Sequence, residues 1–275
     1  MAFWCVESNN AVVIASYDNP PMNYFCAQGA QELGALIEQW RGDAAVRAIV
    51  LCGSGAGNGF ITHYSVEELL GYASDPEAMR AMGTSLNRGY HGLLLALRDL
   101  PKVVIVAMNG NTMGGGFELS LAADIRVGQN SDVRYGLPEV RLGIIPGGSG
   151  TQRLARLIGA GRAIEFVLRS RIVAPAEALA MGLVHEVADD AVARARQIAA
   201  EVAALPPLSI AAAKRAIYAG SDTHLAAGSE MESAWFFETM LSNDARLAMQ
   251  TYVDLPFEQR RGWLERSDYP AYAGN

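Results

Sequence analysis

An apolar run that leads into three consecutive glycines most constrains what this chain can fold into. Residues 103–108 read Val-Val-Ile-Val-Ala-Met, which has the length and β-branched content of a buried strand. After Asn109-Gly110, the glycines at 114–116 precede residues 117–124, for which the sequence predicts a helix. Backbone N–H groups at a helix start are unpaired and lie at the positive end of the helix dipole. The segment therefore predicts amide donors that can stabilise a developing negative charge.

Two glutamates follow this predicted donor site along the chain. Glu118 is expected in the first turn of the helix, where an acidic side chain is also a routine partner of the dipole. Glu139 follows Pro138 in a predicted loop, where an isolated carboxylate is usually solvated. A second glycine-rich turn, residues 147–151, leads into another predicted helix and is able to bind an anion. Two carboxylates beside free amides in an apolar segment favour proton chemistry next to an oxyanion.

With these residues in place, the sequence resembles the enoyl-CoA hydratase/isomerase (crotonase) superfamily, from about Ala11 to Ile217. The motifs that carry the resemblance are Met108-Asn109-Gly110, Gly114-Gly115-Gly116-Phe117-Glu118-Leu119, Ala123-Asp124-Ile125, Gly136-Leu137-Pro138-Glu139-Val140, Leu142-Gly143-Ile144-Ile145-Pro146-Gly147-Gly148, Gly150-Thr151-Gln152-Arg153-Leu154 and Ala176-Glu177-Ala178-Leu179-Ala180-Met181-Gly182-Leu183-Val184.

The resemblance implies a mixed α/β (α+β) fold in two parts. Residues 1–204 would form the family's crotonase-like spiral of β-β-α turns. Residues 205–275 would form a C-terminal helical region that packs subunits into homotrimers, often paired as dimers of trimers. The apolar patch Trp235, Phe236, Phe237, Met240 and Leu241 is then either intramolecular core or a subunit interface, and we favour the interface.

The resemblance also assigns site residues. Glu118 and Glu139 would be catalytic, with Glu118 activating water and Glu139 protonating Cα, while Asp124 would be structural. The N–H groups of Tyr64 and Gly115 would form the oxyanion hole. Contacts with the acyl-CoA substrate would come from Met22, Thr62, Tyr64, Gly114, Gly115 and Pro138. Residues 147–151 would mainly shape the acyl pocket.

The segment around Tyr64 departs from the family pattern Phe-Ser-Ala-Gly-Ala-Asp-Leu-Lys-Glu. Any residue except proline supplies a backbone donor, so Tyr64 still fits its role. His63 replaces a glycine, and we favour a histidine bonded to backbone over an extra acid/base group. Glu67 replaces a lysine near the cofactor phosphates, and Lys214 or Arg215, from this or a neighbouring subunit, is a candidate replacement.

Retention of both glutamates favours an enoyl-CoA hydratase, a lyase that adds water syn across the α,β double bond without a metal or redox cofactor. The alternatives are an enoyl-CoA double-bond isomerase, a specialised acyl-CoA hydrolase or lyase, and a catalytically degenerate acyl-CoA-binding subunit. A nicotinamide-dependent enzyme is disfavoured, because the glycine triplet lacks the spaced dinucleotide fingerprint.

Composition narrows the partners and the compartment. The net charge of −7 argues against nucleic acid as a partner. Three cysteines without metal-ligand spacing indicate free thiols in a reducing compartment. The sequence shows no secretory leader and no apolar stretch long enough for a membrane span, so we expect a cytoplasmic protein.

Periodicity and turn residues predict the remaining elements. They are strands at 11–16, 46–52 and 184–187, helices at 28–41, 75–97, 162–168 and 175–181, a flexible loop at 53–59, a helix C-cap at Gly182, and alanine-rich helices from Asp190 that break at Pro206-Pro207.

Overall fold

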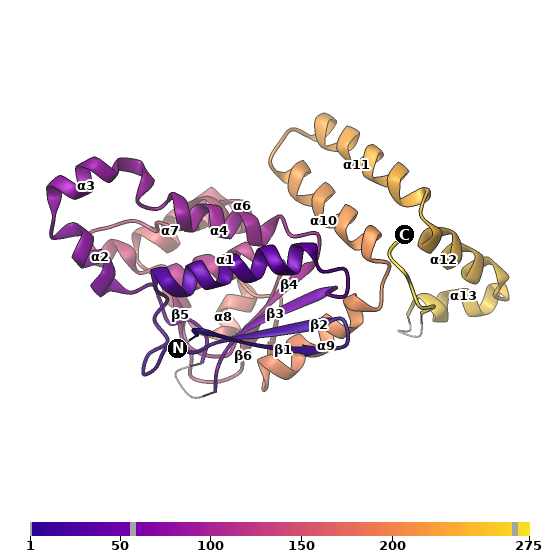
Figure 1. Cartoon of the computed structure of the whole chain (residues 1–275), viewed down its shortest axis with the longest axis horizontal. Helices are drawn as coiled ribbons and strands as arrows, with labels where there is room; N and C mark the ends of the chain where they lie inside the picture. Colours follow the sequence, from indigo (N-terminus) through magenta and orange to yellow (C-terminus); the bar gives the residue numbers. More distant parts are fainter. Residues whose placement is uncertain (1, 56–58, 266–268) are drawn as a thin grey trace.

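The protein is a mixed α/β structure built on two sheets (Figure 1). The computed structural model describes residues 2–55, 59–265 and 269–275. The large sheet has the order β1-β2-β3-β4-β6-β9, with β1 and β2 antiparallel and the other neighbours parallel. Its strands are β1 (Trp4–Asn9), β2 (Val12–Tyr17), β3 (Ala48–Gly53), β4 (Val103–Met108), β6 (Ile125–Gln129) and β9 (Glu186–Ala188). The small sheet contains β5 (Thr112–Met113), β7 (Tyr135–Gly136) and β8 (Ile172–Val173).

The apolar run at 103–108 is strand β4 at the centre of the large sheet, which confirms the prediction of a buried strand. All of its residues are buried. Val104, Val106 and Met108 pack on one face, and the residues between them pack on the other. A parallel strand covered on both sides reads as a continuous apolar run, which is why this stretch was recognisable.

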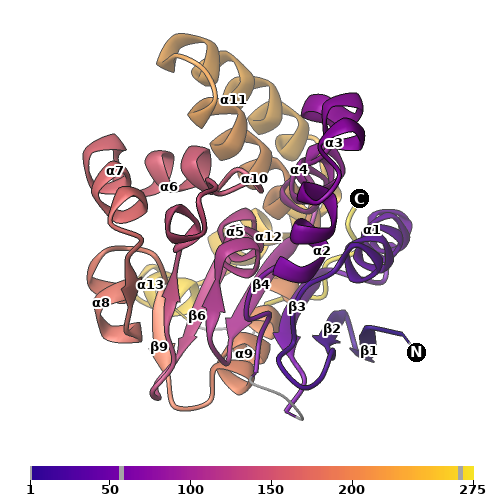
Figure 2. The ribbon, with the colours of Figure 1, turned by 90° about the vertical axis from the view of Figure 1, so that its left-hand side faces the viewer.

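Helices cover both faces of the large sheet (Figure 2). Helix α9 (Ala191–Ala203) lies on one face and buries its alanines against β2, β3, β4 and β6. On the other face lie α1 (Ala27–Gly42), α4 (Arg88–Arg98) and α5 (Gly114–Ala122). The predicted helix at 28–41 is confirmed as α1, and it buries the predicted stripe of Leu33, Ile37 and Trp40.

Residues 75–97 are mostly helical, as predicted, but they do not form one continuous helix. That region contains α3 (Pro76–Met82), the short 3₁₀ helix η1 (Gly83–Ser85) and then α4. Gly83 has φ +51, a conformation that glycine adopts without steric cost and that ends a helix. Because the residues on both sides have helical composition, the sequence did not reveal this break. The start of α4 lies beside the glycine-rich loop at 147–150, where the side chain of Asn87, the N-cap of α4, donates to the Gly147 carbonyl at 3.0 Å.

The remaining helices and strands agree with their predictions. Pro206 separates α9 from α10, and Gly182 takes φ +76 after α8, as expected for a glycine past a helix end. The predicted loop at 53–59 includes residues 56–58, which lie outside the described residues. The helices not yet named are α2 (Val66–Ala73), α6 (Gly150–Ile158), α7 (Ala160–Leu168), α8 (Pro175–Ala180), α10 (Pro207–Ser221), α11 (Leu225–Met240), α12 (Asn243–Asp254) and α13 (Phe257–Leu264).

A buried ion pair fastens α10 to the sheet. Lys214 Nζ lies 2.7 Å from Asp124 Oδ2 and donates to the Lys102 carbonyl at 2.9 Å, and the Tyr218 hydroxyl donates to Asp124 Oδ1 at 2.9 Å. The structural role expected of Asp124 is confirmed. The suggestion that Lys214 of this chain replaces the missing phosphate-binding lysine is wrong, because its ammonium group is buried and already paired.

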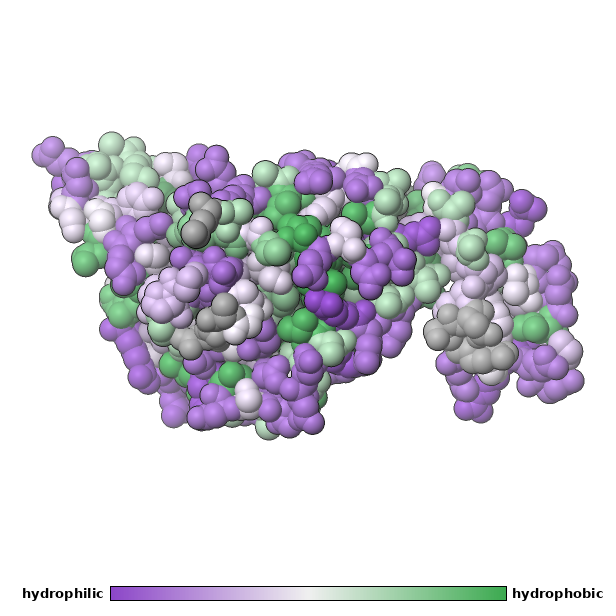
Figure 3. Space-filling view, turned by 60° about the horizontal axis from the view of Figure 1, so that its bottom comes forward, coloured by the Kyte–Doolittle hydropathy of each residue, from purple (hydrophilic) through white to green (hydrophobic). Residues whose placement is uncertain are grey.

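Helices α11 to α13 project from the main body (Figure 1), as the space-filling view in Figure 3 also shows. The apolar patch on α11 is not core within this chain, because Phe236 is 66% exposed, Phe237 61% and Leu241 68%. The alternative that these side chains form intramolecular core is therefore wrong. Trp235 is half-buried, and Arg215 Cζ lies 5.1 Å from the centroid of its ring. Among the described residues, no helix is long and apolar enough to cross a membrane.

Candidate active site

The glycine triplet forms the first turn of α5 and does not precede the helix as predicted. Glu118 consequently lies in the second turn, so a simple partnership with the dipole at the first turn does not explain it. Close packing explains the glycines. A Cβ at Gly116 would lie 2.2 Å from the Ile61 carbonyl oxygen, and a Cβ at Gly115 would lie 2.8 Å from Tyr64 Cβ. The bare helix start therefore lies directly against segment 61–64.

The N–H groups of Tyr64 and Gly115 are both available as donors. Tyr64 forms an isolated parallel bridge with Phe25, in which the Phe25 N–H donates to His63 and the Ser65 N–H donates to Phe25, at 2.8 and 2.7 Å. This pattern directs the Tyr64 N–H to the opposite side. A Cβ at Gly115 would lie 3.4 Å from Tyr64 N, so the two amides are neighbours. Within the described part of the chain, neither N–H has a hydrogen-bond acceptor.

Glu118 is a buried carboxylate held by backbone amides. Its side chain is 2% exposed, and Oε1 accepts hydrogen bonds from Gly148 N at 2.7 Å and Gly150 N at 2.6 Å. Burial raises the pKa of Glu118 from 4.5 to about 7, and the two amides limit that rise. The glycine-rich turn at 147–151 thus donates two backbone amides to Glu118, while its expected role in shaping the acyl pocket stays a prediction.

Glu139 is buried without a hydrogen-bond partner. It begins the 3₁₀ helix η2 (Glu139–Leu142) directly after Pro138 and is 8% exposed. It is therefore not a solvated carboxylate in a loop. Neither of its carboxylate oxygens has a partner among the described residues. Burial raises the pKa of Glu139 to about 8, and the nearby Glu118 carboxylate adds to the rise. An orphaned buried carboxyl group of this kind is typical of a functional site.

The start of α5 brings the glutamates and the amides together. A Cβ at Gly114 would lie 3.2 Å from Glu139 Oε1 and 3.7 Å from His63 Cβ, so Glu139 faces the segment that carries the Tyr64 amide. Glu118 projects from the next turn of the same helix. The arrangement offers one amide-anchored carboxyl group, one unpartnered carboxyl group and two free N–H donors. These groups can bind a carbonyl oxygen and move protons at adjacent carbons.

The other predicted substrate contacts line the same region. Thr62 is buried, and its hydroxyl donates to the Met22 carbonyl at 2.5 Å while its own carbonyl accepts from Met113 N at 2.7 Å. Met22 and Pro138 are half-buried. The Thr62 hydroxyl is therefore committed to holding the backbone beside the site.

The His63 side chain is hydrogen-bonded to backbone, which is the alternative that the sequence favoured. Its Nδ1 lies 2.7 Å from the Tyr64 carbonyl oxygen, and its ring stacks on Tyr24 with 4.3 Å between centroids. Glu67, at the position of the family lysine, lies in the first turn of α2 and accepts from the Ser65 hydroxyl at 3.1 Å. A negative charge there is favourable for the helix dipole.

Sequence reasoning missed the contribution of α4 to this site. The Tyr90 hydroxyl donates to the Gly115 carbonyl at 2.5 Å, next to one of the two free amides. The amides that anchor Glu118 were also missed. No spacing rule links residues so far apart in the chain, and only the tertiary contact reveals them.

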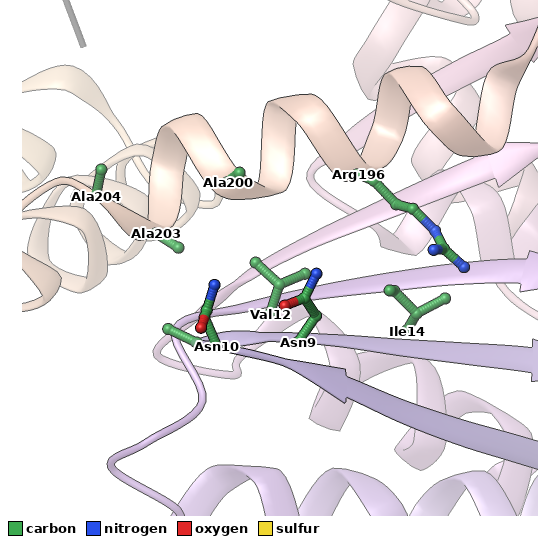
Figure 4. Close-up of a pocket in the computed structure, with 9 residues that line it drawn as sticks. Asn9, Asn10, Val12, Ile14, Arg196, Ala200, Ala203 and Ala204 are labelled. Atoms are coloured by element: carbon green, nitrogen blue, oxygen red, sulfur yellow. The ribbon is translucent and has the colours of Figure 1, made fainter. Parts of the chain in front are cut away.

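A separate pocket lies away from these groups. It measures about 280 Å³ and opens between the β1–β2 turn and α9, with Asn9, Asn10 and Arg196 among its lining residues (Figure 4). It contains neither glutamate. Within the described residues there is also no cluster of three or more His, Cys, Asp or Glu side chains that could hold a metal.

The two raised pKa values predict that stability falls as pH rises. Both carboxyl groups bind protons more tightly in the folded than in the unfolded chain, so their stabilisation is complete below pH 4.5 and is lost through about 7 and 8. At about pH 9, Glu139→Gln should therefore increase the free energy of unfolding by on the order of 2–4 kcal/mol and so raise Tm above wild type. At about pH 5 it should change Tm little. Thermal unfolding measured at both pH values checks this, and an equal effect at both would contradict it.

Comparison with known proteins decides the family. The model of the enoyl-CoA hydratase/isomerase family matches residues 7–261. The chain belongs to this family. Among its relatives, YngF of Bacillus subtilis is 36% identical over 251 residues, covering 90% of this chain and 94% of that protein. The short-chain-enoyl-CoA hydratase of Clostridium acetobutylicum is 30% identical over 256 residues, covering 90% and 94%.

A solved member of the family has the same fold. The crystal structure of an enoyl-CoA hydratase from Bacillus anthracis superposes with a TM-score of 0.84 at 30% identity, covering 99% of this chain and all of that one. The crotonase-like fold expected from the sequence is thus confirmed.

Proposed function

We propose that this family member is an enoyl-CoA hydratase, a hydro-lyase that adds water across the α,β double bond of an acyl-CoA thioester. One observation carries the proposal. Glu118 and Glu139, both buried and both with raised pKa values near 7 and 8, lie beside the start of α5, close to the free amides of Tyr64 and Gly115. Hydration needs one base, one acid and an oxyanion site, and these groups supply all three. The reaction requires no metal or redox cofactor.

In the proposed reaction each of these groups has one role. The thioester carbonyl oxygen accepts hydrogen bonds from the N–H groups of Tyr64 and Gly115. Water forms a C–O bond to Cβ and gives a proton to the Glu118 carboxylate, while the π electrons move through Cα onto the carbonyl oxygen. The resulting enolate collapses as Cα takes the proton of Glu139. The two amides stabilise the enolate oxygen more than the ground-state carbonyl, which is how they lower the barrier.

The assignment of base and acid rests on the hydrogen bonds of the two carboxyl groups. Burial raises both pKa values, and the amides of Gly148 and Gly150 favour the charged form of Glu118. Neither carboxyl oxygen of Glu139 has a hydrogen-bond partner among the described residues, and the nearby Glu118 further disfavours its charged form, so Glu139 is the better candidate for the acid.

A bell-shaped pH profile of kcat/KM is the expected result. The acidic limb should fall below about 7 as Glu118 is protonated, and the alkaline limb above about 8 as Glu139 is ionised. Since the two groups interact, the limbs report macroscopic pKa values of the pair. Initial rates of hydration across the pH range measure the profile. A flat profile through both limbs would contradict the assignment.

The direct test is hydration of crotonyl-CoA and longer 2-enoyl-CoAs by the purified protein, followed as loss of the conjugated-thioester absorbance. Turnover supports the proposal. Absence of turnover on the whole series, with conversion of 3-enoyl-CoA to 2-enoyl-CoA, would instead assign an isomerase. That second candidate is favoured by one observation, the unpartnered Glu139, because a single mobile proton carrier at that position is sufficient for a double-bond shift.

Assembly and location complete the proposal. We infer a homotrimer, or a pair of trimers, in which the exposed apolar side chains Phe236, Phe237 and Leu241 pack against a neighbouring subunit. Light scattering in solution would measure the assembly, and a monomer at working concentration would overturn it. Three free cysteines are consistent with the cytoplasm.

A further inference from the structure

The first turn of α4 touches both segments that build the proposed site. From this turn the Tyr90 hydroxyl donates to the Gly115 carbonyl at 2.5 Å. The preceding Asn87 donates through its side chain to the Gly147 carbonyl at 3.0 Å, in the loop whose amides hold Glu118. One helix end therefore restrains the oxyanion-hole segment and the glutamate-anchoring loop together.

The Tyr90 ring also contacts the other oxyanion donor. Its centroid lies 5.9 Å from that of Tyr64 and 5.9 Å from that of Phe25, and the Phe25 and Tyr64 rings are 6.2 Å apart. Phe25 is the residue whose backbone bridges Tyr64 and directs its N–H. Tyr90 thus reaches one donor residue through its hydroxyl and the other through its ring.

The surroundings hold the Tyr90 side chain in one place. A Cβ at Gly148 would lie 2.4 Å from Tyr90 Cε1, so the ring occupies the space that a side chain at 148 would fill. Desolvation by burial and the neighbouring Glu118 carboxylate hold the Tyr90 pKa well above its usual value, so the hydroxyl stays protonated and remains a donor.

We propose that Tyr90 is a positioning residue that sets the spacing of the Tyr64 and Gly115 amides around the substrate oxygen. The inference rests on the proposed acyl-CoA chemistry of this site. Tyr90 acts on the donors and not on the reacting atoms. The hydroxyl fixes the peptide that follows the Gly115 amide, and the ring supports Tyr64. A misplaced donor loses its effect on the transition state far more than on ground-state binding.

The test compares Tyr90→Phe with Tyr218→Phe. Both tyrosines are half-buried, and both variants keep the ring and lose one donating hydroxyl, which in Tyr218 donates to the structural Asp124 at 2.9 Å. Tyr90→Phe should fold, because the Gly115 carbonyl keeps its place in the hydrogen-bond ladder of α5. The measurements are Tm, kcat and KM for crotonyl-CoA, and the absorbance red shift of a bound 4-dimethylaminocinnamoyl-CoA, which reports polarisation of the thioester carbonyl.

Tyr90→Phe should lower kcat by about tenfold with little change in KM, and should reduce the red shift. Tyr218→Phe should lower Tm and leave kcat and the red shift at wild-type values. If Tyr90→Phe matches Tyr218→Phe in all readouts, or raises KM alone, the positioning role is overturned. A wild-type red shift without hydration of any enoyl-CoA would overturn the hydratase proposal, while the shifts of the two variants would still decide this inference. Absence of a wild-type shift on binding overturns the inference, because no polarising amide pair then exists to be positioned.

Discussion

Glu139→Gln is expected to lower kcat for hydration by about 10²–10⁴-fold while the thioester still binds. The amide is nearly the same size as the carboxyl group, but it cannot deliver a proton to Cα. Glutamine is uncharged, as Glu139 mostly is at neutral pH, so the variant should be about as stable as wild type there. Loss of activity together with retained stability separates a chemical role from a structural one. Steady-state rates and equilibrium binding of an enoyl-CoA measure the two quantities.

Glu118→Gln should lose turnover to a similar extent. Its side-chain oxygen can keep both hydrogen bonds from Gly148 and Gly150, so the loop and the fold should persist without the base. Glu77→Gln, an exposed glutamate on α3, is the matched control and should retain the wild-type rate. Unchanged rates in both Glu118→Gln and Glu139→Gln would defeat the two-carboxylate mechanism.

Gly115→Ala is also expected to have a large effect, by a different route. The new Cβ would lie 2.8 Å from Tyr64 Cβ and 3.4 Å from Tyr64 N. The first distance is closer than two non-bonded carbon atoms approach in proteins. Relief of this contact must move the two donor segments apart. Because both amides need to reach one oxygen, kcat should fall by about 10²–10³-fold, which is the effect of losing one oxyanion donor in other enzymes.

Gly161→Ala provides the control for that experiment. Gly161 is also in the first turn of a helix, α7, and a Cβ there would meet nothing within 4 Å. It should leave kcat unchanged and raise Tm slightly, because alanine is the better helix former. The red shift of a bound cinnamoyl thioester should shrink in Gly115→Ala and persist in Gly161→Ala. A full red shift and full rate in Gly115→Ala would show that the Gly115 amide is not a donor to the substrate.

The parts of the fold that sequence predicted best are those where one local pattern determines the structure. Strand β4 reads as unbroken apolar residues because both of its faces are covered, and α1 shows its buried stripe at helical spacing. The break within 75–97 was not predicted, for the opposite reason. Residues with helical propensity lie on both sides of it, and Gly83, which takes a positive φ, ends α3 before η1 and α4 follow.

The site shows the same division. Motifs at 114–118 and 136–139 identified the candidate residues, but the partners of those residues could not be read from the chain. Glu118 meets Gly148 and Gly150 across a turn between helices, and Gly115 meets Tyr90 from a helix whose start was not recognised. These contacts depend on how α4, α5 and α6 pack, and packing leaves no periodic signal.

The hydrogen bonds from backbone amides to Glu118 connect two properties of the site, the pKa of this carboxyl group and the shape of the space beside it. Burial raises the pKa of Glu118, and the Gly148 and Gly150 amides, which belong to the turn that opens α6, limit that rise. From the family resemblance we expect the same turn to shape the space for the acyl chain. Enlarging or narrowing that space by redesign at 147–150 will therefore also retune the base, and chain-length variants should differ in their pH optima as well as in their substrates.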